Sequence, residues 1–183
     1  MDLTFGELTD TPLGPISFYA GDRGLRGLYF SPLKSIKKQE NLREGRPSLF
    51  GLETVGLLFS ELNEYMFGIR RTFSTKIDWD VVTGFQQKVL EVTLEIPYGQ
   101  VRTYGEVAET LRKPGAARAV GIALGRNPLP IVIPCHRVIG ADGSLRGYTN
   151  GIDSKAFLLG LEGQNISGGN RITLSTNEDE DKS

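Results

Sequence analysis

The stretch Ile133-Pro134-Cys135-His136-Arg137-Val138 contains the only cysteine and the only histidine of this 183-residue chain, side by side. A thiol attacks as its thiolate, and a free cysteine with a pKa of ~8.5 provides only a few per cent thiolate at neutral pH. A neighbouring imidazole can take the thiol proton. A lone cysteine is more often a small buried apolar residue. Here an apolar run and a proline precede it, and polar, glycine-rich residues follow, which predicts a chain leaving the core to form a pocket.

The overall composition is that of a globular protein, with 39% hydrophobic and 23% charged residues and a formal net charge of −1. The length allows one large domain or two small ones. No segment approaches the ~20 apolar residues of a membrane span, and the amino terminus lacks a secretory signal. We therefore expect no membrane partner and a cytoplasmic location, or a nuclear one in a eukaryote. One cysteine excludes an internal disulfide, and with one histidine it cannot close a structural zinc site, so no metal and no cofactor are expected.

The charges are unevenly distributed along the chain. Residues 178–183 carry four acids and one base. Residues 100–150 have a local excess of positive charge, because only three acids accompany Arg102, Arg112, Lys113, Arg118, Arg126, Arg137 and Arg146. Most charge clusters are solvated faces, but this one is also compatible with nucleic-acid binding.

The first half of the chain reads as a small α+β module. Apolar residues alternate in three segments of the first thirty residues, separated by turn sequences, and predict an antiparallel meander of two or three strands. Residues 34–48 are polar and basic and are expected to form a loop. Helical spacing then runs from Leu52 to Tyr65, with Gly68 as a stop, and Phe73 and Ile77 suggest a further strand. No catalytic constellation is visible in this half.

The second half reads as mostly helical after a linker at residues 79–84. Val89, Val92 and Leu94 mark one helix, which Pro97-Tyr98-Gly99 ends. Thr103 and Glu106 form the pattern of a capping box for a helix from Tyr104 to Leu111. A second short helix, 116–124, follows a Lys-Pro-Gly breaker, which gives a helix-turn-helix pattern. Such a pattern is more often simple packing than DNA reading, but the small residues around Arg118 would suit insertion into a groove.

Seven motifs together resemble those of a known family. Residues 85–163 resemble the catalytic domain of the O6-alkylguanine-DNA alkyltransferase family, through 96–101 (IPYGQV), 103–104 (TY), 117–121 (ARAVG), 126–128 (RNP), 134–138 (PCHRV), 147–148 (GY) and 158–163 (LLGLEG). The first half, residues 1–78, resembles the family's variable first domain in outline only. The resemblance implies an α+β fold: a small antiparallel sheet with a helix, in ribonuclease H-like outline, then a helical domain with a helix-turn-helix. Residues 164–183 are expected to form a flexible acidic tail.

The resemblance implies an irreversible, single-turnover repair of DNA. The family's cysteine takes the alkyl group from guanine O6, and the resemblance implies that O4-alkylthymine is also a substrate. Cys135 matches this nucleophile, His136 the base that acts through a water, and Glu162 the carboxylate that orients the imidazole. Tyr104 matches the phenol that donates toward guanine N3. Asn127 matches the amide that ties the loop before the cysteine to the recognition helix, the second helix of the helix-turn-helix (116–124).

The resemblance also implies how DNA is bound. Arg118 matches the family's intercalating arginine on a helix that enters the minor groove of double-stranded DNA, and Ala117, Gly121 and Tyr104 belong to the same surface. The substrate pocket is expected to comprise Leu124, Pro130, Val138, Tyr148, Thr149 and Asn150. Asn150 stands where many relatives have glycine, which could alter the alkyl groups accepted. The protein is expected to act as a monomer.

Three other functions remain open from the residues alone. A non-catalytic binder of alkylated DNA would be similar in the helix-turn-helix, but such family members carry tryptophan in place of the cysteine. A cysteine hydrolase could reuse Cys135, His136 and Glu162, but it would leave the helix-turn-helix and Arg118 unexplained. A transcriptional regulator would need a second DNA-binding domain, and none is visible in the sequence.

Overall fold

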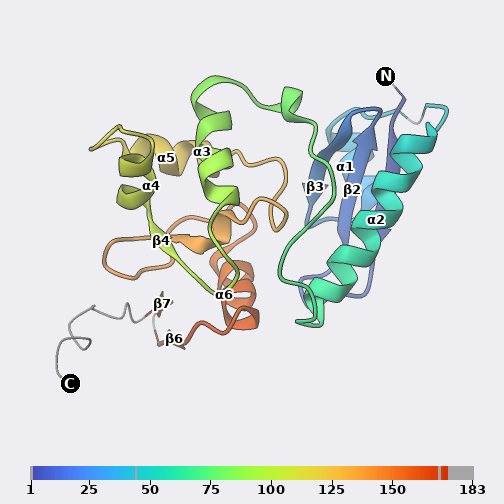
Figure 1. Cartoon of the computed structure of the whole chain (residues 1–183). Helices are drawn as coiled ribbons and strands as arrows, with labels where there is room; N and C mark the ends of the chain where they lie inside the picture. Colours follow the sequence, from blue (N-terminus) through green and yellow to red (C-terminus); the bar gives the residue numbers. More distant parts are fainter. Residues whose placement is uncertain (1, 44, 169, 173–183) are drawn as a thin grey trace.

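The first half of the chain is a three-stranded antiparallel sheet with a long helix across it (Figure 1). The computed structural model describes residues 2–43, 45–168 and 170–172. The strands follow one another in the sheet as β1 (Thr4–Leu8), β2 (Ile16–Gly21) and β3 (Gly24–Tyr29). The helix α2 (Leu49–Met66) begins after Ser48, whose hydroxyl accepts from the Gly51 N–H. It ends before Gly68, which takes the positive φ (71°) that glycine tolerates best. The predicted meander and helix are confirmed.

Two predictions for this half are wrong. The segment expected to be a loop contains the helix α1 (Leu33–Gln39), because Ile36 is buried and Lys37 and Lys38 suit the negative end of a helix. The strand expected through Phe73 and Ile77 does not form. Ile77 makes only an isolated parallel bridge with Leu25 at the edge of the sheet.

The second half is mostly helical and lies beside the first (Figure 1). Its elements in chain order are the one-turn helix η1 (Trp79–Val81), α3 (Gly84–Leu94), β4 (Arg102–Thr103), α4 (Tyr104–Thr110), α5 (Ala117–Leu124), the one-turn helix η2 (Cys135–Arg137), β5 (Val138–Ile139) and α6 (Ile152–Leu161). The predicted capping box of α4 is present, with both Thr103 and Glu106 bonds formed. The parallel pair β4–β5 fixes the residues that follow Cys135 beside the start of α4.

The two halves share one hydrophobic core. Phe18, Leu62 and Tyr65 of the first half belong to the same buried cluster as Leu90 and Cys135 of the second. Burial of each large apolar side chain stabilises a fold by about 1.5–3 kcal/mol, so this continuous cluster holds the halves together. The domain boundaries at 78 and 85 stay a prediction.

The described carboxyl-terminal residues continue past α6 in two short strands. Residues after Gln164 form the short strands β6 (Ile166–Ser167) and β7 (Arg171–Ile172). Ile172 is buried and its N–H donates to the Gly143 carbonyl at 2.9 Å, so the expected flexible tail does not begin at residue 164. The acidic residues 178–181 lie outside the described residues. Within the described part of the chain, no helix combines the length and apolar character needed to cross a membrane.

Candidate active site

Cys135 begins the one-turn helix η2 and lines a small cavity. The residue is only 7% exposed, and the cavity of about 90 Å³ is also lined by Asn127, Pro130, Tyr148, Thr149 and Asn150. Leu28 and Tyr29 of strand β3 complete its wall from the first half of the chain. Burial raises the pKa of the Cys135 thiol, and this effect outweighs the opposing influence of Asn127 and the Lys155 charge. The sulfur therefore rests as a thiol and needs a base to react.

Asn127 fixes the loop that leads to Cys135. Its Nδ2 donates to the Ile133 carbonyl at 2.9 Å and to the Cys135 sulfur at 3.1 Å, and its Oδ1 accepts from the Leu129 N–H at 3.0 Å. Ile131 in this loop has φ of 72°, a conformation that is strained for a β-branched residue. Such strain persists only where surrounding contacts hold it, so this loop is firmly held in place.

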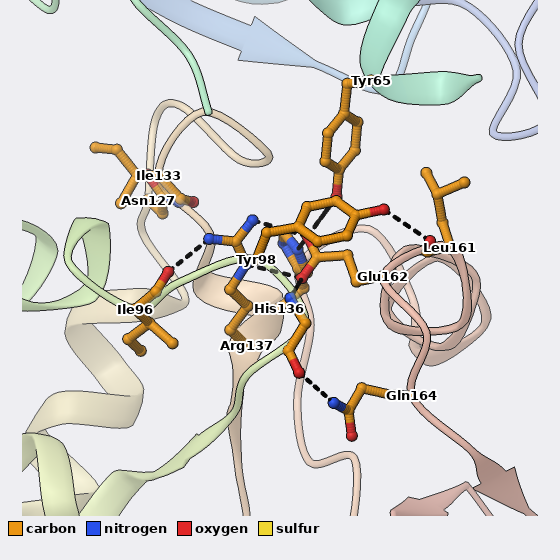
Figure 2. A network of polar contacts seen from close by, with 11 residues as sticks. Tyr65, Ile96, Tyr98, Asn127, Ile133, His136, Arg137, Leu161, Glu162 and Gln164 are labelled. Atoms are coloured by element: carbon orange, nitrogen blue, oxygen red, sulfur yellow. Dashed lines mark hydrogen bonds and ion pairs between the residues drawn. The ribbon is translucent and has the colours of Figure 1, made fainter. Parts of the chain in front are cut away.

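His136, the residue that follows Cys135 in the chain, forms a buried pair with Glu162 (Figure 2). His136 Nε2 lies 2.9 Å from Glu162 Oε1, and both side chains are fully buried. A carboxylate only accepts hydrogen bonds, so Nε2 carries the proton and Nδ1 has the free lone pair of the neutral ring. Nδ1 is buried and has no hydrogen-bond partner within the described residues. Burial lowers the pKa of His136 despite the opposing effect of Glu162, which leaves the imidazole neutral and able to accept a proton.

Within the described residues, Glu162 receives hydrogen bonds from four residues (Figure 2). Besides His136, these are Tyr65 Oη (2.7 Å), Arg137 through Nε and Nη2 (2.9 Å each) and the Gly99 N–H (3.1 Å). Burial alone would raise the pKa of Glu162, but the bonds from His136 and Arg137 lower it to about 2. Glu162 is therefore a carboxylate at neutral pH. The sequence did not single out Arg137 or Tyr65 for this site, since Tyr65 looked like one more apolar residue on a helix.

Lys155 is a second residue that the sequence did not indicate. Its side chain on α6 is buried, and its ammonium donates to the Val138 carbonyl at 2.6 Å and to the Arg146 carbonyl at 3.1 Å. Burial lowers the pKa of Lys155 to about 8. Tyr104 donates to the same Arg146 carbonyl at 3.0 Å, so one backbone oxygen links α4 to α6. A lysine on a helix is usually expected to face solvent, so the sequence did not predict that Lys155 points inward.

A larger groove runs along α5 and meets the cysteine cavity. Its volume is about 570 Å³, and the residues expected to contact DNA and two pocket residues line it: Tyr104, Ala117, Arg118, Gly121, Tyr148 and Thr149. Tyr148 and Thr149 also line the cysteine cavity, so the two hollows are adjacent. The Thr149 hydroxyl donates to the Gly125 carbonyl at 2.8 Å, which ties this shared wall to the end of α5.

Two residues predicted for the pocket wall lie elsewhere. Leu124 and Val138 are buried in the hydrophobic core and line neither the groove nor the cysteine cavity. The carbonyl of Val138 accepts from Lys155. Leu124 occupies the inner face of an amphipathic helix whose outer face forms the groove, so its place in a motif did not reveal its direction. Within the described residues, no group of three or more His, Cys, Asp or Glu residues could hold a metal ion.

Comparison with known proteins shows the family to which the chain belongs. The family model described as 6-O-methylguanine DNA methyltransferase, DNA binding domain, matches residues 84–164. The methylated-DNA–protein-cysteine methyltransferase of Methanosarcina barkeri is 42% identical over 161 residues, which are 87% of this chain and 98% of that protein. The chain belongs to the methylated-DNA–protein-cysteine methyltransferase family.

Solved structures of this family have the same fold. The O6-methylguanine methyltransferase of Mycobacterium tuberculosis is 36% identical, with a TM-score of 0.73 over 87% of this chain and 92% of that one. A structure of the Mycobacterium tuberculosis OGT in complex with DNA is also 36% identical, with a TM-score of 0.71 over the same shares. The α+β architecture expected from the resemblance is thereby confirmed for both halves of this methyltransferase-family chain.

Proposed function

We propose that this protein repairs DNA by direct reversal, transferring the alkyl group of O6-alkylguanine to Cys135 and restoring the guanine. The observation that carries this proposal is the position of the cysteine. It lines a cavity that opens beside a groove along α5, next to a neutral histidine backed by a carboxylate. Membership of the methylated-DNA–protein-cysteine methyltransferase family supports the same reaction.

The chemistry begins with a proton transfer. Cys135 rests as a thiol, and the free lone pair on His136 Nδ1 accepts its proton through a water molecule. Glu162 holds the imidazole through Nε2 and stabilises the cation that forms, as the orienting carboxylate does in hydrolase triads. Asn127 donates to the sulfur, which favours the thiolate.

The second step is displacement at carbon. The thiolate attacks the alkyl carbon, a C–S bond forms as the C–O6 bond breaks, and the electron pair of that bond stays on the guanine. Tyr104 neutralises the leaving guanine by donating its proton toward N3, an effect typically worth about 10²–10⁴-fold in rate. Its hydroxyl donates to the Arg146 carbonyl in the free protein and must redirect when the base binds. The thioether product is stable, so each chain reacts once.

The DNA-binding part of the proposal concerns α5. A complex of a related protein with DNA supports DNA as the partner, and we propose that the DNA is double-stranded. The small residues Ala117 and Gly121 allow α5 to approach the minor groove closely, and Arg118 fills the gap left by the extruded nucleotide. Extrusion costs a few kcal/mol, which these contacts must offset. Pro130, Tyr148, Thr149 and Asn150 then surround the base. We propose that the protein acts as a monomer in the cytoplasm and also accepts O4-alkylthymine.

Mass spectrometry of the intact protein tests this function. After incubation with excess oligonucleotide containing O6-methylguanine, we expect one added methyl group per chain, mapped to Cys135, and no further conversion of substrate. Sustained turnover, or a methyl group on another residue, would overturn the proposal. An unmethylated oligonucleotide of the same sequence is the control.

A further inference from the structure

Tyr65 brings a phenol from the first half of the chain into the candidate active site. The residue lies on α2, is fully buried, and packs between Phe73 (ring centroids 5.4 Å apart) and Tyr98 (6.1 Å, edge-on). Its hydroxyl donates to Glu162 Oε1 at 2.7 Å, and its oxygen lies 3.4 Å from His136 Nε2 (Figure 2). Burial and the Glu162 charge raise the pKa of Tyr65, so the phenol keeps its proton.

The hydroxyl competes with the histidine for one oxygen atom. Glu162 Oε1 accepts from Tyr65 Oη, His136 Nε2 and Arg137 Nη2, at 2.7, 2.9 and 2.9 Å. An oxygen with two main acceptor directions shares its charge among three donors, so each bond is weaker than it would be with two. A weaker bond to Glu162 stabilises the imidazolium less and therefore favours the neutral ring.

We propose that Tyr65 is a positioning residue that sets the proton affinity of His136. It holds the Glu162 carboxylate in line with the imidazole and, by occupying part of Oε1, keeps the ring neutral and ready to accept the thiol proton. The inference rests on the proposed alkyl transfer and deepens it. In effect, the first half of the chain adjusts the base used by the second.

Other charged and titratable groups also surround His136. Arg137 on η2 and Lys155 on α6 disfavour the imidazolium, whereas Glu162 at the end of α6 favours it. Tyr98 donates to the Leu161 carbonyl at 2.8 Å, away from the carboxylate. Arg71 lies over the Tyr98 ring, 5.6 Å from its centroid. Of the phenols in this aromatic cluster, Tyr65 is the one that donates to Glu162, so its removal is a specific perturbation.

The test compares Tyr65→Phe with the matched control Tyr98→Phe, which removes a hydroxyl from the same cluster. Single-turnover rates with a methylated oligonucleotide are measured from pH 5 to pH 9. We expect Tyr65→Phe to move the acid limb of the rate profile upward by roughly half a unit to one unit, because each unit of His136 pKa changes the neutral fraction about tenfold below that pKa. At pH values below the His136 pKa, the rate of Tyr65→Phe should be about 3–10-fold lower than that of wild type. At pH 8 the two rates should agree within about twofold. Tyr98→Phe should leave the limb in place.

A uniform loss of rate at every pH, with the limb unmoved, would mean that Tyr65 only supports the fold and would overturn the inference. Titration of His136 by ¹⁵N NMR, in the Cys135→Ala background with and without Tyr65→Phe, gives the same answer without any reaction. An unchanged or lowered His136 pKa in the variant would also overturn it. If the wild-type protein transferred no methyl group to Cys135, the proposed function would fail, while this titration would still decide the role of Tyr65.

Discussion

The two halves of the molecule contribute to the site in different ways. Residues 85–163 carry the groups that we propose to touch the alkyl group or the DNA, with Cys135, His136 and Arg118 close together in sequence. The first half supplies surroundings instead. Tyr65 reaches Glu162 across the shared core, and Leu28 and Tyr29 form one wall of the cysteine cavity. The reactive residues can thus be close in sequence, while distant elements influence the protonation of the histidine and form part of the wall of the cysteine cavity.

A backbone contact strengthens this division of roles. The Leu28 N–H at the end of β3 donates to the Pro128 carbonyl at 2.9 Å, in the loop that Asn127 holds next to Cys135. The first half therefore contacts the candidate site through the main chain of Leu28 as well as through the Tyr65 side chain. We expect changes in the second half to abolish or strongly reduce transfer, and changes in the first half to adjust it.

Replacement of the nucleophile should have the largest effect. Cys135→Ala removes the attacking sulfur and should abolish methyl transfer, because no other cysteine exists in the chain. Binding to methylated duplex DNA should remain within about threefold of wild type, since the side-chain bond that the sulfur loses, from Asn127, lies within the protein. The measurements are a radioactive transfer assay and fluorescence anisotropy. Transfer by this variant would show that the nucleophile has been assigned wrongly.

Glu162→Gln should reduce the transfer rate by about 10²–10³-fold. The amide lacks the charge that stabilises the imidazolium, and it leaves the buried Arg137 without its counter-ion. Single-turnover kinetics at pH 8 measure the effect. Glu64→Gln, which alters a glutamate of the first half paired with Arg70, is the control and should be close to wild type. Equal rates for the two variants would remove Glu162 from the mechanism.

Arg118→Ala should separate duplex repair from reaction with a free base. This side chain is proposed to fill the gap that the extruded nucleotide leaves in the base stack. Its loss should slow transfer from duplex DNA by about tenfold or more, because the free-energy cost of extrusion is no longer offset. Reaction with free O6-benzylguanine should change by less than about twofold. Arg126→Ala removes the same charge from a residue that does not line the α5 groove. Similar losses on both substrates would contradict the extrusion role.

Tyr29→Ala should have the smallest effect and should act on selectivity. Tyr29 belongs to the wall that the first half contributes to the cysteine cavity, so removal of its ring enlarges the cavity. We expect the ratio of benzyl to methyl transfer to rise several-fold, with methyl transfer itself within about twofold of wild type. Tyr19→Ala is the control, because Tyr19 stacks on Tyr29 at 6.3 Å but does not line the cavity. If both variants changed the ratio equally, general loosening of the sheet would be responsible.

The sequence predicted the local features of the fold and missed the long-range ones. Apolar alternation identified β1, β2 and β3, and the capping box located α4, because these signals lie within a few residues of one another. The helix α1 was missed because it is short and mostly polar. Ile36 is its single buried residue, so its sequence shows no strong apolar periodicity. The order of β6 and β7 depends on Gly143, about thirty residues away in the chain.

The same distinction applies to the candidate site. Motifs gave Cys135, His136 and Glu162, and the structure brings the last two into contact. Tyr65 and Lys155 were not found, because the direction of one side chain on a helix is decided by packing between elements rather than by its neighbours in sequence. Leu124 and Val138 were assigned to the pocket for the converse reason, since a motif position does not reveal which way a residue faces.

The proposed reaction starts from a neutral His136 imidazole, with its proton on Nε2, and a neutral Cys135 thiol. Because the chain has one histidine, ¹⁵N NMR of the imidazole reports on His136 alone. We expect a protonated Nε2 and an unprotonated Nδ1 at pH 7, with the pKa of His136 lowered by burial from its usual value. Above that pKa the base is available, and transfer should be lost as the pH falls through it. An imidazolium at pH 7, or a proton on Nδ1 of the neutral ring, would contradict the account.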